Sequence, residues 1–195
     1  MDSAPAQVLP HWSDGTVALE PATLAHTDFL LRNRSDPEIL RYLDREPLAS
    51  RDEALAFAQR LVDDNATGRA AVWLIREQAS GQPAGTVALW RLDRANDLGE
   101  VGYTLLPEFW GRGYARRALA AVLDHGFGVL GLHRIEANIN PDNARSRGLL
   151  ERLGFRLEAR LRENYRFRGR YLDSHIYGLL ASEHAGACRA PGGSP

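Results

Sequence analysis

The stretch Trp110-Gly-Arg-Gly-Tyr-Ala115 decides how the rest of this sequence is interpreted. Residues 99–105 before it have the composition of a strand, and apolar residues at helical spacing run from Ala115 to Phe127 after it. A loop between a strand and a helix points its backbone N–H groups at whatever lies at the helix N-terminus, and glycines allow close approach. A pyrophosphate fits this position, and a tight turn without a ligand is the alternative.

Strand-like runs lie on both sides of this loop and its helix. Short turns separate the three runs up to the loop, which predicts an antiparallel meander. After the helix come a further strand, a helix expected to start at Asn140-Pro141 and stop at Gly154, and a hairpin joined through Arg168-Gly-Arg170. The fold class is therefore α/β (α+β), with a mixed central sheet flanked by helices. These strands are predicted at residues 70–76, 85–91, 99–105, 133–138, 155–166 and 171–180.

The first part of the chain adds one strand and three helices to this pattern. Residues 16–21 read as a short strand, and residues 23–43 as two short helices broken near Asp36-Pro37. Ser50-Arg-Asp-Glu53 matches the capping box, in which serine and glutamate side chains satisfy free backbone N–H groups. A longer helix is predicted from there to about Asn65.

The composition is that of one ordinary globular domain. Hydrophobic residues make up 44% of the 195 and charged residues 25%, and the net charge of −1 argues against disorder and against a nucleic-acid-binding surface. We expect a loose segment at residues 1–15, one domain at residues 16–182 and a flexible tail at residues 183–195. Exposed strand edges leave a homodimer open.

The sequence also favours a cytoplasmic protein without metal. The N-terminus lacks a basic start followed by an apolar run, and nowhere do about 18 apolar residues follow one another, so no membrane contact is expected. The single cysteine, Cys188, excludes a disulfide framework and a cysteine-based metal site. The six histidines have no metal-ligand spacing.

An ordered series of motifs surrounds the glycine loop. Glu100-Val-Gly-Tyr-Thr-Leu105 and Pro107-Glu-Phe-Trp110 precede it, and Asn143-Ala-Arg-Ser146 and Leu153-Gly-Phe155 follow. This series resembles the GNAT acetyltransferase superfamily, and specifically its RimJ/RimL-type branch of ribosomal-protein N-terminal acetyltransferases. The resemblance covers nearly all of residues 16–182. It implies a sheet in which two parallel strands, here residues 99–105 and 133–138, splay apart and admit acetyl-coenzyme A into the gap.

The resemblance also implies which residues hold the cofactor. The backbone at the end of the first splayed strand would hold the pantetheine and thioester, the loop amides would cradle the phosphates, and an asparagine would bond to the pantetheine arm. Arginines in the first turns of the helix would add charge there, or would simply be solvated. The residues at these positions are Leu105, Leu106, Gly111, Arg112, Gly113, Tyr114, Ala115, Arg116, Arg117, Asn143 and Ser146.

Transfer to an amine needs one base and one proton donor. An amine attacks a thioester directly once it has lost its proton and lies within about 3 Å of it. Glu100 is the first candidate for the base because it lies on the strand that leads to the gap, and Glu163 in the last hairpin is the reserve. A surface glutamate paired with a neighbouring arginine is the alternative for Glu100.

The donor to the leaving thiolate departs from the common pattern. Many GNAT enzymes have a tyrosine four residues after the position of Ser146, where this chain has Leu150. The RimJ/RimL-type pattern implies that Ser146 donates to sulfur instead. We therefore expect an N-acetyltransferase that acts on the N-terminal α-amine of a protein or peptide. A small amine as acceptor and a non-catalytic acyl-coenzyme A-binding module are the alternatives.

Overall fold

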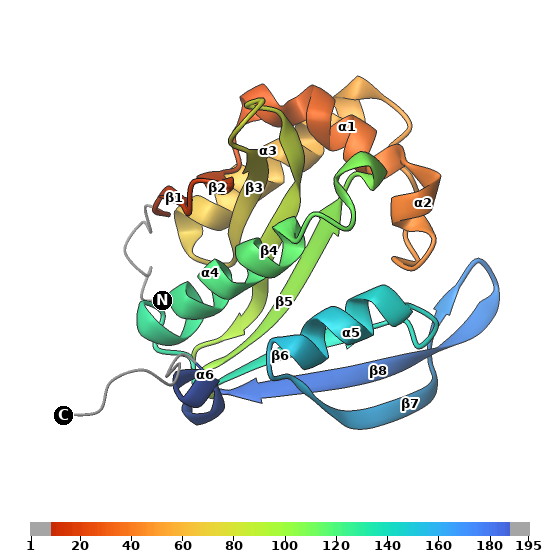
Figure 1. Ribbon diagram of the computed structural model, residues 1–195. Coiled ribbons are helices and arrows are strands. Elements are labelled where there is room, and N and C mark those ends of the chain that lie inside the picture. Colours follow the sequence, from red (N-terminus) through yellow and green to blue (C-terminus); the bar gives the residue numbers. More distant parts are fainter. Residues whose placement is uncertain (1–8, 188–195) are drawn as a thin grey trace.

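The computed structural model describes residues 9–187 of the chain, which form one sheet with helices on both faces (Figure 1). The eight strands follow the order β1-β2-β3-β4-β5-β6-β8-β7, and β5 and β6 are the only parallel neighbours among them. This confirms the predicted mixed, mostly antiparallel sheet. The strands are β1 (Trp12–Ser13), β2 (Val17–Pro21), β3 (Ala71–Glu77), β4 (Pro83–Asp93), β5 (Leu98–Leu105), β6 (Arg134–Ile139), β7 (Arg156–Phe167) and β8 (Arg170–Leu180).

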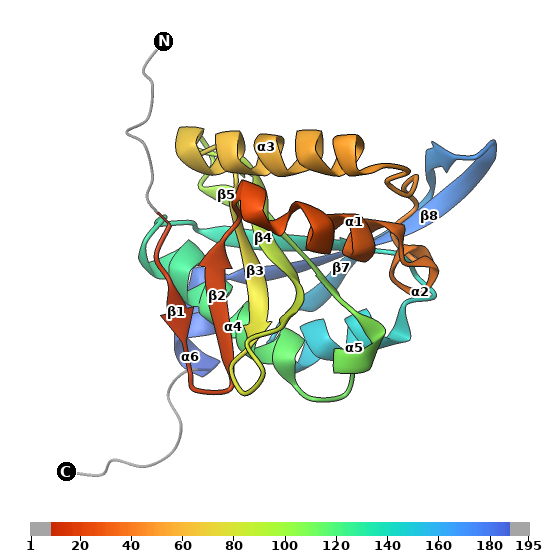
Figure 2. The ribbon, with the colours of Figure 1, turned by 90° about the horizontal axis from the view of Figure 1, so that it is seen from above.

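Figure 2 shows α1 and α3 on one side of the sheet and α4, α5 and α6 on the other. Alternation along β3 explains both layers, because Val72 and Leu74 pack with α1 and α3 whereas Trp73 and Ile75 pack with α4. The helices are α1 (Thr27–Ser35), α2 (Pro37–Leu40), α3 (Arg51–Thr67), α4 (Tyr114–Gly128), α5 (Ala144–Arg152) and α6 (Ala181–Ala187), with short 3-10 helices η1 (Leu24–His26) and η2 (Pro107–Phe109). No helix within residues 9–187 is long and apolar enough to cross a membrane.

Helix α3 begins with the predicted cap. The Ser50 hydroxyl accepts a hydrogen bond from the Glu53 N–H at 3.2 Å, as expected for a capping serine. The Glu53 carboxylate reaches back one residue further than the motif predicts and accepts from the Ala49 N–H at 2.8 Å. Two acidic residues in the first turn add to the favourable charge at this N-terminus, which is therefore closed to other anions.

Helix α5 starts later than predicted. We expected Pro141 at its first position, whereas α5 begins at Ala144 and Asn143 is its N-cap. The Asn140 side chain accepts a hydrogen bond from the Asp142 N–H at 2.9 Å, and this local turn replaces the first helical turn. Asn143, rather than Asn140, is therefore the residue whose side chain caps the N-terminus of α5.

Both ends of the described chain are more ordered than predicted. Residues up to 15 were expected to be loose, but β1 pairs with β2 and Trp12 packs against the main core. The tail was expected from residue 183, but α6 continues there because Glu183 accepts from the Leu180 N–H and pairs with Arg156. The remaining parts of these expectations, together with Cys188, lie outside the described residues.

The parallel strands β5 and β6 pair over three residues and then separate. Their register runs from Leu98 opposite Arg134 to Glu100 opposite Glu136, while β5 continues to Leu105 and β6 to Ile139. Figure 1 shows the two strands diverging toward α2 and α5. The structure thus confirms the predicted splayed pair.

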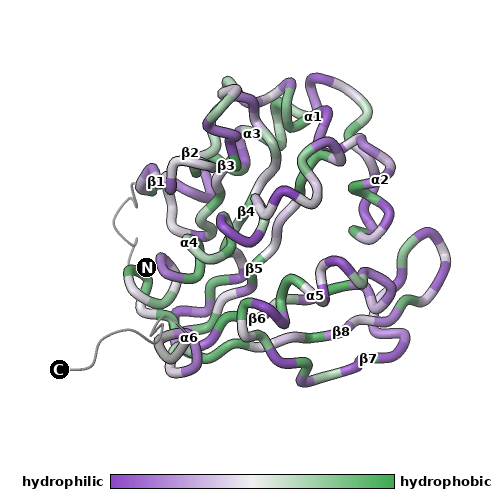
Figure 3. The backbone as a smooth tube through the Cα atoms, viewed as in Figure 1, coloured by the Kyte–Doolittle hydropathy of each residue, from purple (hydrophilic) through white to green (hydrophobic). Residues whose placement is uncertain are grey.

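Beyond the gap, β7 and β8 form a long hairpin. In Figure 3 hydrophilic colour runs along much of β7, which agrees with the exposure of most of its side chains. The hairpin tip contacts the loop after α2, since the Tyr165 hydroxyl donates to Asp44 at 2.5 Å and Arg168 binds Glu46 through two N–H groups. These contacts hold the loop at residues 44–46 beside the gap.

Candidate active site

The backbone of β5 offers free hydrogen-bonding groups to the gap. The Leu106 N–H donates to the Ala84 carbonyl at 2.8 Å, which makes these two residues a hydrogen-bonded pair of the β4–β5 ladder. Because such pairs alternate along antiparallel strands, the backbone groups of Tyr103 and Leu105 point away from β4 and into the gap. The Leu105 carbonyl accepts from the Trp110 indole at 2.8 Å, so its N–H is the group left for a ligand.

Leu106 does not fit the role expected for it. Its N–H is used by Ala84, its carbonyl accepts from the Phe109 N–H, and its side chain is fully buried. The pairing with β4 uses the N–H of Leu106, and the turn into η2 uses its carbonyl. Of the two predicted pantetheine contacts, Leu105 keeps a free donor and Leu106 does not.

The N-terminus of α4 is built to receive an anion. Gly111 and Gly113 have φ of 75° and 79°, in the left-handed region, and an added Cβ at either would touch nothing within 4 Å. Glycine is therefore favoured at both positions because the path of the loop needs a positive φ, and not because a side chain would lack space. Gly113 is the N-cap of α4, no side chain caps the helix, and its first turn holds no acidic residue. The first amides of α4, from Tyr114 to Arg116, are consequently available to phosphate.

A cleft of about 970 Å³ runs from this helix end to α2 and α5. It contains the loop glycines, Leu105, Asn143 and Ser146, so the structure brings most of the predicted cofactor residues together. Arg116, Arg145 and Arg152 line it without an ion pair among the described residues, and Arg145 lies over the Trp110 ring at 4.6 Å. Although Glu38 and Asp142 also line the cleft, these three arginines are available to a phosphate-rich ligand.

The other two arginines of the loop and the first turn are already paired. Arg112 binds Glu77 at 3.0 Å, and Arg117 binds Asp14 at 2.6 Å. Both pairs fasten the start of α4 to β3 and to the turn before β2. Of the three arginines considered at the phosphates, Arg116 alone is without an acidic partner within residues 9–187.

Ser146 lies on α5 with its hydroxyl 2.7 Å from the hydroxyl of Tyr103 on β5. The Asn143 side chain accepts from the Ser146 N–H at 3.0 Å and so fixes the start of the helix that carries Ser146. Burial raises the pKa of Tyr103 to about 12, so its phenol stays protonated at neutral pH. Leu150, where the common tyrosine is missing, is fully buried in the main core.

Tyr103 is a site residue that the sequence motifs did not single out. Its alternation with Val101 and Leu105 indicates the α4 side of the sheet, but 43 residues separate it from Ser146. The pairing depends on how α5 packs across the gap, which no local pattern records. Together the two hydroxyls form a part-buried pair in the cleft wall.

Glu100 lies on the opposite face of the sheet and does not line the cleft. It stands directly across from Trp90 on the side covered by α1 and α3, at the last residue pair before β5 and β6 separate. Its side chain is 12% exposed and binds Arg91 at 2.9 Å. Burial raises the pKa of the Glu100 carboxyl, while the charge and hydrogen bond of Arg91 oppose this shift. A carboxylate with a raised pKa at the edge of the gap suits proton transfer near neutral pH.

The reserve candidate, Glu163, lies in a different environment. It is exposed on β7 at a bulge between Leu161 and Tyr165, with φ of 50°. Its N–H donates to the Asp173 carboxylate at 2.8 Å, a contact that stabilises the bulge. The backbone of Glu163 thus serves to form the bulge in β7. Glu100, in contrast, lies where β5 and β6 separate.

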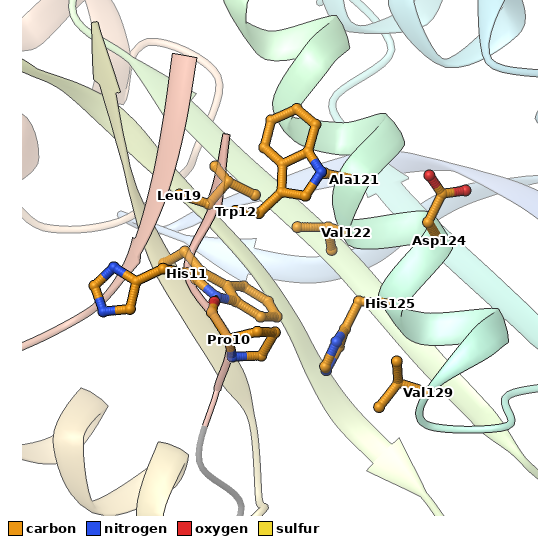
Figure 4. A pocket seen from close by; sticks show the side chains of 10 residues that line it. Pro10, His11, Trp12, Leu19, Ala121, Val122, Asp124, His125 and Val129 are labelled. Carbon is orange, nitrogen blue, oxygen red and sulfur yellow. The ribbon is translucent and has the colours of Figure 1, made fainter. Parts of the chain in front are cut away.

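A second, smaller pocket of about 240 Å³ lies between β1, β3 and the C-terminal half of α4 (Figure 4). Trp12, Trp73 and His125 line it, and the His125 ring meets Trp73 edge-on with ring centres 5.2 Å apart. None of the predicted site residues takes part in it. Within residues 9–187 no group of three or more histidine, cysteine, aspartate or glutamate side chains is arranged to hold a metal ion.

A sheet split by two parallel strands, with an uncapped helix N-terminus at the split, is the arrangement expected of an acyl-coenzyme A-binding acyltransferase. Residues 16–156 match the acetyltransferase (GNAT) domain, and the chain belongs to the GNAT acetyltransferase family. It is 33% identical over 170 residues to an uncharacterized N-acetyltransferase, p20, of Bacillus licheniformis, covering 87% of this chain and 96% of that one. A putative ribosomal N-acetyltransferase, YdaF, of Bacillus subtilis is 32% identical over 106 residues, 54% of this chain and 58% of its own length.

The fold also matches solved structures of this family. The spermidine N-acetyltransferase of Vibrio cholerae, solved in complex with CoA and spermine, superposes with a TM-score of 0.78 at 25% identity, covering 88% of this chain and 99% of that one. The protein is an acetyl-coenzyme A-dependent N-acetyltransferase. Its own residues fit the cofactor, since free amides, unpaired arginines and the Leu105 N–H line one cleft.

Proposed function

We propose that the acceptor is the N-terminal α-amine of a protein or peptide, and that the chain is of the RimJ/RimL type. The observation that carries this proposal is a row of polar side chains on β6 beside Glu100. Arg134, Glu136 and Asn138 alternate onto the same side as Glu100, and all three are at least partly exposed. In this proposal an extended peptide lies along these residues with its first residue at the gap.

Glu100 acts as the base in this proposal, directly or through one water. An α-amine has a reference pKa near 8, so much of it must lose a proton before it attacks at neutral pH. The carboxylate lies on the face from which the acceptor arrives, and its raised pKa brings it closer to that of the amine. The charge and hydrogen bond of Arg91 favour the ionised form of Glu100, which is the form that accepts the proton.

Ser146 and Tyr103 donate toward the leaving sulfur from the other face. A thiol has a reference pKa near 8.5, so full transfer of a serine proton to the thiolate would be strongly unfavourable. Tyr103, with a pKa of about 12, is a stronger acid than a serine hydroxyl and lies 2.7 Å from Ser146. Since the phenol is still a weaker acid than the thiol, neither hydroxyl gives up its proton: Tyr103 donates to Ser146, and Ser146 donates a hydrogen bond to the departing sulfur, which stays a thiolate until solvent protonates it. This pair supplies the donor that Leu150 cannot.

A small amine is the second candidate acceptor. The relative from Vibrio cholerae is named a spermidine N-acetyltransferase and was solved with spermine, which favours a polyamine for that protein. The third reading, a non-catalytic acyl-coenzyme A-binding module, rested on Leu150, and the Tyr103–Ser146 pair weakens it. We also propose, from the exposed edge strand β7, a homodimer in the cytoplasm.

The deciding experiment is thiol release from acetyl-coenzyme A with a panel of acceptors. The panel contains peptides with free N-termini, the same peptides with blocked N-termini, and polyamines, each tested with wild type and Glu100→Gln. Release that requires a free peptide N-terminus supports the proposal. Release with polyamines alone would replace it by the second candidate, and cofactor binding without release for any acceptor would favour the binding module.

A further inference from the structure

Two arginines enclose Phe57 on the face of the sheet that carries Glu100. The guanidinium carbon of Arg34, at the end of α1, lies 4.9 Å from the ring centre, and that of Arg60, on α3, lies 5.1 Å from it. Cations over an aromatic face are held in place by the ring electrons without using their N–H donors. Both guanidinium groups are thereby positioned and still able to bind an anion.

A second pair of arginines encloses Trp90, the residue directly opposite Glu100. Arg91 lies 4.5 Å from a Trp90 ring centre and Arg45 lies 5.5 Å from it. Arg91 reaches Glu100 because β4 has a register shift after Trp90, where Arg91 adopts φ of 48°. We call Arg34, Arg45, Arg60 and Arg91 the arginine cluster.

Three members of the cluster have no acidic partner. Within residues 9–187 no carboxylate lies at ion-pair distance from Arg34, Arg45 or Arg60. The two acidic neighbours of Arg45 in the chain, Asp44 and Glu46, are bound by the tip of the β7–β8 hairpin. They anchor the loop and are not free to pair with Arg45.

The like charges of the cluster are close enough to affect one another. Burial and the charges of Arg45 and Arg60 lower the pKa of Arg34 to about 10, which leaves it protonated at neutral pH. Glu100, already bound by Arg91, is the carboxylate whose charge acts on Arg45. This part of the face therefore carries three arginines without an ion-pair partner among residues 9–187, although the chain as a whole has a net charge of −1.

We propose that Arg34, Arg45 and Arg60 bind a carboxylate of the acceptor and so select an amine that also carries a carboxylate. The proposal rests on Glu100 as the base, since Trp90 joins the cluster to that residue. Guanidinium groups bind carboxylates through paired N–H donors, which suits these three side chains. An acidic side chain near the N-terminus of a peptide and the carboxylate of a free amino acid share this chemistry. A polyamine, which is positively charged, would be repelled.

The test compares acceptors that differ in charge alone. One peptide has a free N-terminus and glutamate at its second and third positions, and its counterpart has glutamine there. Free glutamate and spermidine complete the set. We expect the double variant Arg45→Gln/Arg60→Gln to raise KM for the glutamate peptide by about 10-fold or more, as loss of charge-assisted hydrogen bonds predicts. KM for the glutamine peptide and for acetyl-coenzyme A should change by less than about 2-fold, within the small effect of exposed charges.

The control variant is Arg94→Gln, which removes one exposed arginine from the β4–β5 turn, outside the cluster. It should leave both peptides unaffected. Equal use of the two peptides by wild type, or a preference for spermidine, would overturn the proposal. A preference for free glutamate over the peptide would support the carboxylate site and show that the bound carboxylate belongs to a free amino acid.

A binding measurement separates this proposal from the proposed reaction. The N-acetylated glutamate peptide is titrated into wild type and the double variant by calorimetry, where no turnover is possible. Binding by wild type that the double variant loses supports the carboxylate site even where no acceptor is turned over. Undetectable or equal binding by the two proteins, with turnover intact, would refute the carboxylate site and leave the transferase assignment standing.

Discussion

The two faces of the sheet serve the gap between β5 and β6 in different ways. On the face of α4 and α5 lie the uncapped helix end, the cleft and the Tyr103–Ser146 hydroxyl pair. On the face of α1 and α3 lie Glu100 and the arginine cluster. The first face supplies hydrogen-bond donors toward the cofactor, whereas the second supplies the carboxylate proposed to accept the proton of the amine.

This difference shows how one strand separates the base from the hydrogen-bond donors. Side chains of β5 alternate between the two faces, so Glu100 and Tyr103, three positions apart, point to opposite faces. A carboxylate in direct contact with the two hydroxyls would accept their hydrogen bonds and so compete with the sulfur for the same donors. With the sheet between them, each can keep its own protonation state, and substitutions on the two faces should have different signatures.

The largest effect is expected from closing the helix end on the cofactor face. Gly113→Glu places a carboxylate where the phosphates would lie and should weaken acetyl-coenzyme A binding by about 100-fold or more, since it removes two or more charge-assisted contacts. Calorimetry measures this directly. Gly113→Ala isolates the strain of φ at 79°, and Gly128→Glu adds the same charge at the other end of α4, where an added Cβ has open space. Unchanged affinity in a folded Gly113→Glu protein would refute the phosphate assignment.

On the acceptor face, Glu100→Gln should lower kcat by about 100-fold, the usual contribution of general base catalysis. Affinity for acetyl-coenzyme A should stay the same, because Glu100 lies outside the cleft. Turnover and calorimetry together separate the two quantities. Glu163→Gln is the matched control, and a larger loss there would move the base to the hairpin.

The hydroxyl pair should show a smaller, coupled effect. Ser146→Ala and Tyr103→Phe should each lower kcat by about 10-fold to 100-fold, in the range of a single positioned donor. The double variant should be no slower than the slower single variant, because the two hydroxyls form one hydrogen-bond chain to the sulfur. Independent losses that multiply in the double variant would show that they act separately, and an equal loss of cofactor affinity would make Ser146 a binding residue.

Much of this arrangement could be predicted from the sequence because its signals are local. Alternation in residues 99–105, the glycines at 111 and 113 and the cap at Ser50 each act within a few residues. The same reasoning failed where a side chain competed with a local rule, as when Asn140 displaced the helix start expected at Pro141. It also could not show that β4 and the turn into η2 together use both backbone groups of Leu106.

The rest depends on contacts between distant segments. Tyr103 meets Ser146 only because α5 packs across the gap, and the arginine cluster gathers residues from α1, the loop after α2, α3 and β4. Each of those arginines alone reads as a solvated surface residue. What distinguishes three of them is that no carboxylate within residues 9–187 lies at ion-pair distance from them, and only the packed structure can show this.

The smallest predicted effect is also the most specific to one face. Arg91→Gln removes the cation that lowers the pKa of Glu100, so that pKa should rise. The reaction needs ionised Glu100, and the acid limb of the kcat profile should therefore move to higher pH, by less than about one unit for so exposed an arginine. Arg91→Lys keeps the positive charge, so its acid limb should lie close to that of wild type. Ser146→Ala should lower the whole profile without moving its acid limb, because that hydroxyl lies on the other side of the sheet; an acid limb that Arg91→Gln leaves in place would exclude Glu100 as the base.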